Sequence, residues 1–292
     1  MKKMLLVSIL FLVAAATTYP RQSDFPKLSG PYLGQKLPGM TPEIFAPGII
    51  SRPDSHEFGC TFSSDGKEFY DTSGRGALSE IWCSRVEDGV WTAPERVKFS
   101  EGYFAHEPHV TFDGKKLFFG SKRPQPGNKE AEQYGIWFTE RERNGWSEAK
   151  FAGQGTQVSS TRDGKLYVTD NSGPGDGYLS RVTMADGRFV RYERLLDGIE
   201  KLRPKYTRIA HPCIAPDDSY IVFDVEGGAH LFVSFKNSNG TWNEPVDLAD
   251  YGFNEEDGIA SISPDGKYLF FGRNRDIYWV DTKIIEKLKP KL

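Results

Sequence analysis

The segment Asp257 to Gly272, DGIASISPDGKYLFFG, indicates the fold, because four other stretches of the chain resemble it. Each joins small and β-branched residues to an aromatic-rich run through a turn with Asp-Gly or Asp-Asp at its core, which is typical of a β-hairpin. The four are HEFGCTFSSDGKEFY from His56, HEPHVTFDGKKLFFG from His106, QVSSTRDGKLYVTD from Gln157 and HPCIAPDDSYIVFD from His211. Successive turn aspartates are 48, 50, 54 and 48 residues apart, a period that indicates a propeller or a solenoid.

Each repeat holds more than a hairpin. A third strand-like segment follows, such as EIWCSRV from Glu80, and in the first four repeats a fourth, such as VWTAPERVKF from Val90. Four strands per repeat is the composition of a propeller blade. The fifth repeat ends after its third segment, DIYWVDT from Asp276.

The missing strand has a candidate near the other end of the chain, in TPEIFAPGIIS from Thr41 to Ser51. Its pairing with the last repeat would close a ring and remove the open edges of a linear array. The sequence therefore predicts an all-β, five-bladed β-propeller of four-stranded antiparallel blades, with the last blade closed by an N-terminal strand. A six-bladed ring with one degenerate blade is the alternative, but the chain has no spare length for it.

The flanking segments complete the predicted organisation. Residues 1–16 have a charged start, an apolar run and Ala14-Ala15-Ala16, as in a secretory signal peptide. The alternative, a membrane anchor, needs about 20 apolar residues, which exceeds this run. We expect a periplasmic or secreted protein without a membrane span in its mature chain. Residues 17–40 form an extended lead-in that adds little stability, 41–285 the propeller and 286–292 a lysine-rich tail.

Net charge and cysteine content limit the classes of function that the chain could have. The chain has 37 Lys and Arg against 40 Asp and Glu, a net charge of -3, which argues against a nucleic-acid partner. The three cysteines, Cys60, Cys83 and Cys213, are expected to be buried thiols. Cys60 and Cys83 fall on the first and third strands of one blade, too far apart for a disulfide. A cysteine nucleophile is the less favoured reading, since nothing in the spacing singles one out.

Three phrases, FSSDGKEFY, SPDGKYLFF and DIYWVD, resemble the repeats of TolB-type, WD-repeat-like bacterial propellers. The resemblance covers roughly Thr41 to Ile285. It implies the propeller fold, whereas propellers of this type include scaffolds, glycan-processing enzymes and proteins of other roles. A sialidase is disfavoured, because the Asp-Gly-Lys turns lack the tryptophan of the sialidase repeat.

Candidate site residues gather on one predicted face of the ring. We call it the start face, because the first strands begin there; the Asp-Gly turns define the opposite turn face. Histidines and carboxylates begin the first strands, and cations follow the second strands. The predicted ligand-binding residues are His56, Glu57, Arg75, His106, Glu107, His109, Arg123, Gln157, His211, Asp257 and Arg273.

Two kinds of chemistry suit such a ring. Imidazoles and carboxylates could hold a divalent cation as cofactor, and the candidate ligands are His56, Glu57, His106, Glu107, His211 and Asp257. His106, Glu107 and His211 could instead act as base and acid on a saccharide. The alternative is a purely structural role, in which carboxylates at these positions accept hydrogen bonds from neighbouring blades.

Three functions follow from these alternatives. The first is an exported propeller that binds a small ligand, most plausibly a glycan, at the mouth of the channel. Its support is the polar, partly aromatic start face, near which Tyr103, Phe104 and Tyr134 are expected. The second is a glycan lyase or hydrolase that uses the same face. The third is a TolB-like periplasmic scaffold that binds a protein partner.

Overall fold

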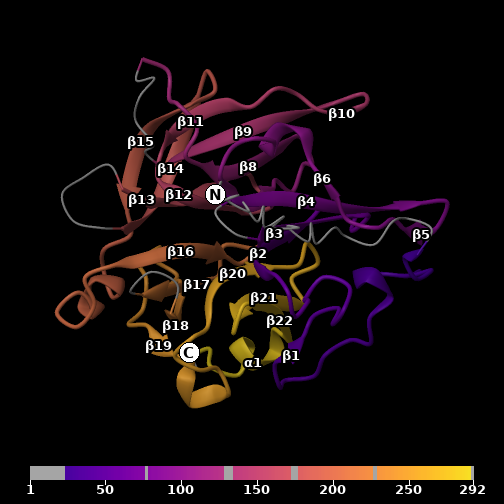
Figure 1. The fold of residues 1–292 in the computed structure, drawn as a ribbon. Coiled ribbons are helices and arrows are strands. Elements are labelled where there is room, and N and C mark those ends of the chain that lie inside the picture. Colours follow the sequence, from indigo (N-terminus) through magenta and orange to yellow (C-terminus); the bar gives the residue numbers. More distant parts are fainter. Residues whose placement is uncertain (1–23, 76–77, 128–133, 172–176, 226–228, 291–292) are drawn as a thin grey trace, which may run out of the picture.

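The computed structural model describes residues 24–75, 78–127, 134–171, 177–225 and 229–290. Five small antiparallel sheets form a ring, as predicted for a five-bladed β-propeller (Figure 1). Blade 1 contains β2 (His56–Phe62), β3 (Glu68–Arg75), β4 (Leu78–Glu87), β5 (Val90–Trp91) and β6 (Glu95–Arg96). Blade 2 contains β7 (Ala105–Val110), β8 (Lys116–Ser121), β9 (Gly135–Glu142), β10 (Gly145–Trp146) and β11 (Lys150–Gln154).

The remaining blades keep the same order from the channel outward. Blade 3 contains β12 (Thr156–Ser160), β13 (Leu166–Asp170), β14 (Tyr178–Ala185) and β15 (Arg188–Arg194). Blade 4 contains β16 (Ile209–Ile214), β17 (Tyr220–Val225), β18 (Ala229–Phe235) and β19 (Val246–Asp247). Blade 5 contains β20 (Gly258–Ile262), β21 (Tyr268–Arg273) and β22 (Asp276–Asp281).

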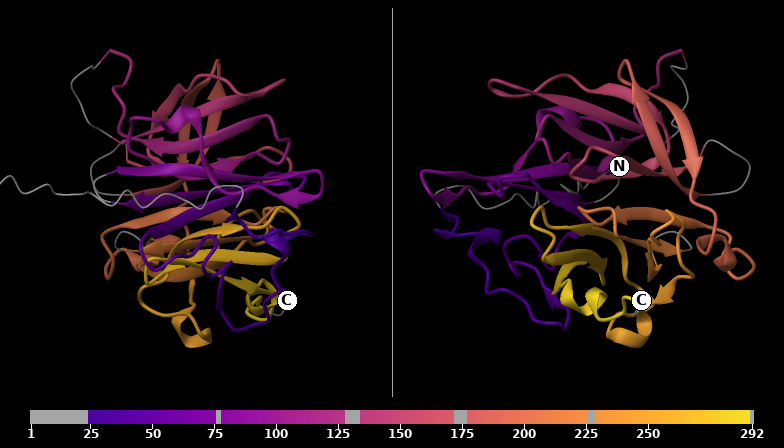
Figure 2. Two further views of the ribbon diagram at one scale, coloured as in Figure 1. Left: turned by 45° about the vertical axis from the view of Figure 1, so that its right-hand side comes forward. Right: turned by 180° about the vertical axis from the view of Figure 1, so that it is seen from behind.

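An N-terminal strand completes blade 5. The two residues of β1 (Glu43–Ile44) pair antiparallel with β22, where Glu43 faces Trp279 and Ile44 faces Tyr278. Figure 2 follows this indigo segment beside the yellow last blade. The next residue, Phe45, donates its N–H to the carbonyl of Ile277 at 2.8 Å. The predicted closure of the ring is confirmed.

The lead-in before β1 packs into the core. Leu33 is fully buried in the cluster that joins blades 5 and 1. Trp91 donates its indole Nε1–H to the carbonyl of Gly30 at 2.8 Å and its backbone N–H to that of Leu28 at 2.9 Å. Residues 28–33 therefore pack on the propeller, and because burial of apolar surface is stabilising, we expect them to contribute more to stability than the sequence suggested.

Among the residues that the structure describes, helical structure is confined to short pieces. The 3-10 turns are η2 (Tyr32–Gly34), η3 (Lys98–Ser100), η4 (Ile199–Leu202) and η5 (Ala249–Tyr251), and the α-helix α1 (Lys283–Glu286) follows β22. Within the described ranges, no helix has the length and hydropathy to cross a membrane.

The first strand of every blade contains a β-bulge, and this feature shapes the channel. One residue of each bulge has a left-handed backbone: Gly59, Glu107, Gln157, His211 and Ile259, with φ between 36° and 55°. Second-strand side chains of the preceding blade accept three of their N–H groups. Thr72 Oγ1 accepts from Glu107 at 2.8 Å, Thr169 Oγ1 from His211 at 2.8 Å and Asp224 Oδ2 from Ile259 at 2.7 Å. The bulges thus lock neighbouring blades together and set the directions of the channel side chains.

All three cysteines are free and buried, as expected. Cys60 lies on β2 and Cys83 on β4, with β3 between them, while Cys213 lies on β16. Burial raises the pKa of the Cys60 and Cys83 thiols to about 12. These cysteines therefore stay protonated and pack as small apolar side chains.

Candidate functional site

Three polar bulge residues link blades across the channel. Gln157 of blade 3 donates from Nε2 to the carbonyl of Ala260 in blade 5 at 2.9 Å. Glu107 of blade 2 reaches His211 of blade 4, with Oε1 3.7 Å from the imidazole Nε2. These contacts join blades that are not neighbours in the ring, so they lie across the channel.

A chain of ionisable groups extends from this crossing. His106 Nδ1 lies 3.2 Å from Glu107 Oε1, and His211 Nδ1 lies 2.8 Å from both carboxylate oxygens of Asp224. Each of the four residues is at most 5% exposed. We call His106, Glu107, His211 and Asp224 the channel cluster.

Within the channel cluster, neighbouring groups of opposite charge favour each other's ionised forms. Burial opposes ionisation of Glu107, but the His106 and His211 imidazoles outweigh burial and lower the pKa of this carboxyl to about 2. Burial also opposes protonation of His211, yet Asp224 and Glu107 raise its pKa above the ordinary value. At neutral pH Glu107 is therefore a carboxylate, and its neighbours favour a protonated His211.

Several polar atoms of this region lack partners. Among the described residues, His106 Nε2, Glu107 Oε2 and Gln157 Oε1 are buried without a hydrogen bond. A buried polar atom without a partner costs about 1–3 kcal/mol, so such atoms are usually satisfied by water or by a ligand.

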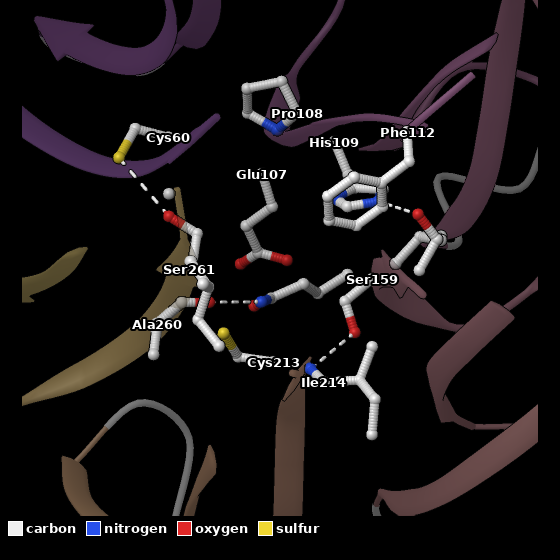
Figure 3. Close-up of a pocket in the computed structure, with 15 residues that line it drawn as sticks. Cys60, Glu107, Pro108, His109, Phe112, Ser159, Cys213, Ile214, Ala260 and Ser261 are labelled. Atoms are coloured by element: carbon white, nitrogen blue, oxygen red, sulfur yellow. Dashed lines mark hydrogen bonds between the residues drawn. The ribbon is translucent and has the colours of Figure 1, made fainter. Parts of the chain in front are cut away.

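The channel beyond Glu107, towards the turn face, is narrow. Figure 3 looks into it, where the Glu107 carboxylate points into the cavity and Cys60, Cys213 and Ser159 lie around it. The cavity leaves about 30 Å³ for the centres of water molecules. That space suits a few waters at most, since one water needs about 10–15 Å³ by this measure. A sugar ring does not fit there.

His109 and Arg162 close the turn-face side. His109 lies 2.8 Å from Ser160 Oγ through Nε2, and burial lowers its pKa to about 4, so it is neutral. Arg162 donates from Nη2 to the carbonyl of Pro264 at 2.9 Å and lies over the ring of Phe112 at 5.7 Å. A ligand that reaches Glu107 would therefore approach from the start face.

Aromatic rings stand beside the channel cluster on the start face. The His106 imidazole lies 5.2 Å from the Phe104 ring and 5.4 Å from the Tyr134 ring. Lys122 Nζ lies over the same two rings, at 5.3 and 4.6 Å. Tyr134 is 40% exposed, so its ring is accessible. We call Phe104, Lys122 and Tyr134 the mouth patch.

Several other predicted site residues lie outside the channel cluster and the mouth patch. Glu57 is buried and accepts hydrogen bonds from Ser55, Ser73 and the N–H of Arg52. Asp257 is buried in a two-pronged ion pair with Arg273, at 2.6 Å for each contact. Among the described residues, both carboxylates thus have partners in their own blade or in the segment before it, and not, as the structural alternative expected, in the neighbouring blades.

The remaining three have different surroundings. His56 is exposed and its ring lies 5.1 Å from that of Phe58. Arg123 donates from Nη2 to the carbonyl of Phe99 at 2.5 Å and stacks on Tyr103 at 4.7 Å, a packing role. Arg75 ends β3, and its side chain lies outside the described part.

The six candidate cation ligands are divided among separate groups. His106, Glu107 and His211 meet in the channel cluster, Glu57 binds its own local donors, and Asp257 pairs with Arg273. In the part of the chain that the structure describes, no three His, Cys, Asp or Glu side chains are placed to hold a metal ion.

Sequence reasoning missed Asp224, which orients His211. The register of the hairpins aligns Asp224 with Thr72, Gly120, Thr169 and Gly272 of the other blades. The other repeats carry Thr or Gly at this position, which faces the bulge of the next blade. An acidic residue there could therefore have indicated a functional position from the sequence alone.

Comparison with known proteins concerns the fold. No protein-family model matches the sequence, and no curated protein matches it. Similar solved structures include TolB from Acinetobacter baumannii (TM-score 0.49, 16% identity, 77% of this chain and 54% of that chain). A putative TolB from Agrobacterium tumefaciens (0.46, 16%, 74% and 69%) and a thermostable family-43 glycoside hydrolase (0.49, 12%, 79% and 91%) also resemble it. The chain spans about half the length of the first of these.

Proposed function

We propose that this propeller is an exported protein that binds a saccharide at the start-face mouth of its channel. The observation that carries the proposal is the buried Glu107 carboxylate, whose Oε2 lacks a partner among the described residues and which contacts His106, whose ring in turn lies 5.4 Å from the accessible ring of Tyr134. A carboxylate accepts hydrogen bonds from sugar hydroxyls, while an aromatic ring packs on the apolar face of a sugar ring. Small-molecule sites commonly combine a few fixed polar groups with aromatic walls in this way.

Binding is better supported than cleavage. A glycosidase needs a carboxylic acid whose pKa is raised, so that it can protonate the leaving oxygen. The pKa of Glu107 is lowered instead, by His106 and His211 against the effect of burial. His211 is held between Asp224 and Glu107, which favours its charged form and disfavours its release of a proton. The channel cluster is therefore suited to hold a ligand by fixed charge.

Affinity electrophoresis with soluble polysaccharides tests the proposal. The gels would contain neutral (dextran, xylan), carboxylated (alginate, polygalacturonate) or sulfated (dextran sulfate) polymers. We expect at least one polymer to retard the protein and to raise its melting temperature by mass action. Tyr134→Ala and Glu107→Gln should lose the retardation, whereas Lys67→Ala and Lys267→Ala on the turn face should keep it.

Two results would contradict saccharide binding. One is the absence of retardation by every polymer of the panel, and the other is equal retardation of the wild type and both mouth variants. Either result would favour a scaffold that binds a protein partner. Melting curves of the unbound variants are the control, since a misfolded variant would lose binding for another reason.

A further inference from the structure

Arg208 lies on the start face and, among the described residues, forms no ion pair with a carboxylate. It directly precedes β16 and stands three residues before His211. Its Nε is buried and has no hydrogen-bond partner among the described residues. A buried guanidinium N–H without an acceptor is costly, and the usual acceptor for it is an anion.

The neighbouring arginines lie beside carboxylates, although Arg203 Nε, like Arg208 Nε, has no hydrogen bond among the described residues. Arg194 and Arg203 lie over the ring of Tyr178, at 3.7 and 4.0 Å. Arg194 Nε lies 3.6 Å from Asp170, and Arg203 Nε lies 3.5 Å from Glu200. Their charges are therefore matched within the protein, and they serve to pack Tyr178.

Arg208 lies near Arg203, because both are close to Gly177. Arg203 donates from Nη2 to the Gly177 carbonyl at 2.6 Å. The Arg208 side chain lies close to the same glycine, where an added Cβ would be 3.1 Å from Arg208 Cγ. The stem of Arg208 thus lies against Gly177, while its Nε has no acceptor in the described part of the chain.

Arg208 also acts on the channel cluster. After burial and the two imidazoles, the Arg208 guanidinium is a further cause of the lowered pKa of Glu107. Its charge therefore reaches the channel cluster. Glu107 is compensated by its imidazole neighbours, so its charge does not exclude an anion from the vicinity of Arg208.

We propose that Arg208 binds the carboxylate of an acidic saccharide, a uronate, at this mouth. The inference rests on the proposed function and specifies its ligand class. The planar guanidinium offers Nε–H and Nη–H in a fork that matches the two oxygens of a carboxylate. In this arrangement Glu107 accepts from hydroxyls of the sugar, and Tyr134 of the mouth patch packs on a sugar ring.

The experiment compares polymers that differ in their acidic group. Dissociation constants would be measured at one fixed salt concentration for polygalacturonate, alginate, methyl-esterified polygalacturonate and dextran sulfate. We expect the wild type to bind a uronate polymer, with methyl esterification weakening the binding of polygalacturonate. Arg208→Ala should weaken uronate binding about tenfold or more, the loss of a hydrogen bond to a charged group. Arg208→Lys keeps the charge without the fork and should fall between.

Arg191→Ala is the matched control. Arg191 lies on the outer strand β15, is exposed, and pairs with Glu193 at 2.9 Å, so its replacement changes the net charge equally but away from the mouth. We expect its affinity to stay within about twofold of the wild type, since distant surface charges are screened. Melting curves would establish that each variant is folded.

The outcomes separate this inference from the proposed function. If Tyr134→Ala loses binding but Arg208→Ala does not, saccharide binding stands and the role of Arg208 is wrong. Binding of dextran sulfate in preference to both uronate polymers would overturn the carboxylate assignment. If no polymer binds at all, both proposals fail.

Discussion

Asp71 is a fully buried carboxyl group on β3, and both of its oxygens lack partners among the described residues. Burial, followed by the nearby Glu57, raises its pKa well above the ordinary value of 3.8. The hairpin register places apolar residues at the matching positions of the other blades: Phe119, Val168, Phe223 and Phe271. Asp71 is thus an acid in an apolar position.

We predict that Asp71→Asn stabilises the protein at neutral pH. In the folded state Asp71 keeps its proton above pH 3.8, whereas the unfolded chain releases it, so wild-type stability falls as pH rises. The variant lacks this loss, and its advantage should grow above that pH by up to about 1.4 kcal/mol per pH unit. Urea unfolding at several pH values measures it. A constant difference at all pH values would mean that Asp71 does not titrate between the two states.

Glu107 should have the opposite pH dependence. Its pKa is lowered from 4.5 to about 2, so the stability that its charge contributes is present above pH 4.5 and is lost as pH falls towards 2. We predict that Glu107→Gln costs on the order of 3 kcal/mol at pH 7, from the size of this shift. The cost should disappear near pH 2 in acid unfolding experiments. An equal cost at both ends of the range would assign it to packing.

The sequence identified the channel cluster only in part, for a physical reason. His106, Glu107 and His211 were found because histidines gather at the starts of the first strands. Glu57 and Asp257 were grouped with Glu107, but the bulges align Glu107 with Gly59 and Ile259, two residues later. A bulge redirects side chains without a strong sequence signal, so the turns alone could not show which carboxylates face the channel.

The closing strand has only two paired residues, both exposed, whereas the residue that follows is buried. Phe45 is fully buried among four aromatic rings, at centroid distances of 5.0 to 6.2 Å: Phe62, Phe69, Phe270 and Trp279. These rings belong to blades 1 and 5, so Phe45 fills the seam where the ring closes.

We predict that Phe45→Ala destabilises the protein by about 3–5 kcal/mol, the usual cost of removing a buried phenylalanine. Ile44→Ala is the control on the same strand; Ile44 is 38% exposed, so its replacement should cost less than about 1 kcal/mol. Chemical denaturation of both variants measures the difference. Similar costs would mean that strand pairing, not the seam, holds the closure together.

The sequence predicted this closure from the missing fourth strand of the last repeat, which is a matter of counting strands. It could not predict that residues 28–33 also pack on the seam. That segment has no periodic pattern, and its contacts, such as the hydrogen bonds from Trp91, depend on where the finished ring places blade 1.

The two faces of the ring differ in their chemistry. On the turn face, aspartates such as Asp65 and Asp265 accept hydrogen bonds from residues two positions away, as turns require. On the start face, Glu107, Tyr134 and Arg208 differ from their counterparts in other blades. Variation of this kind is not needed to build the ring, so a ligand is expected on this side.

The cysteines report on whether the closed ring unfolds as one unit. Cys60 belongs to the core cluster between blades 5 and 1, Cys83 to that between blades 1 and 2, and Cys213 to that between blades 4 and 5. Buried thiols with raised pKa values react slowly until the protein opens. Their alkylation in denaturant therefore records the opening of three separate seams.

We predict that all three cysteines become reactive at the same urea concentration in the wild type, because a closed ring has no free end at which unfolding can begin. In Phe45→Ala the seam between blades 5 and 1 is weakened, and Cys60 should become reactive at a lower urea concentration than Cys83. Pulsed alkylation followed by mass spectrometry of peptides measures each site. Different midpoints for the three cysteines in the wild type would mean that the blades open one by one, as in a linear repeat array, despite the pairing of β1 with β22.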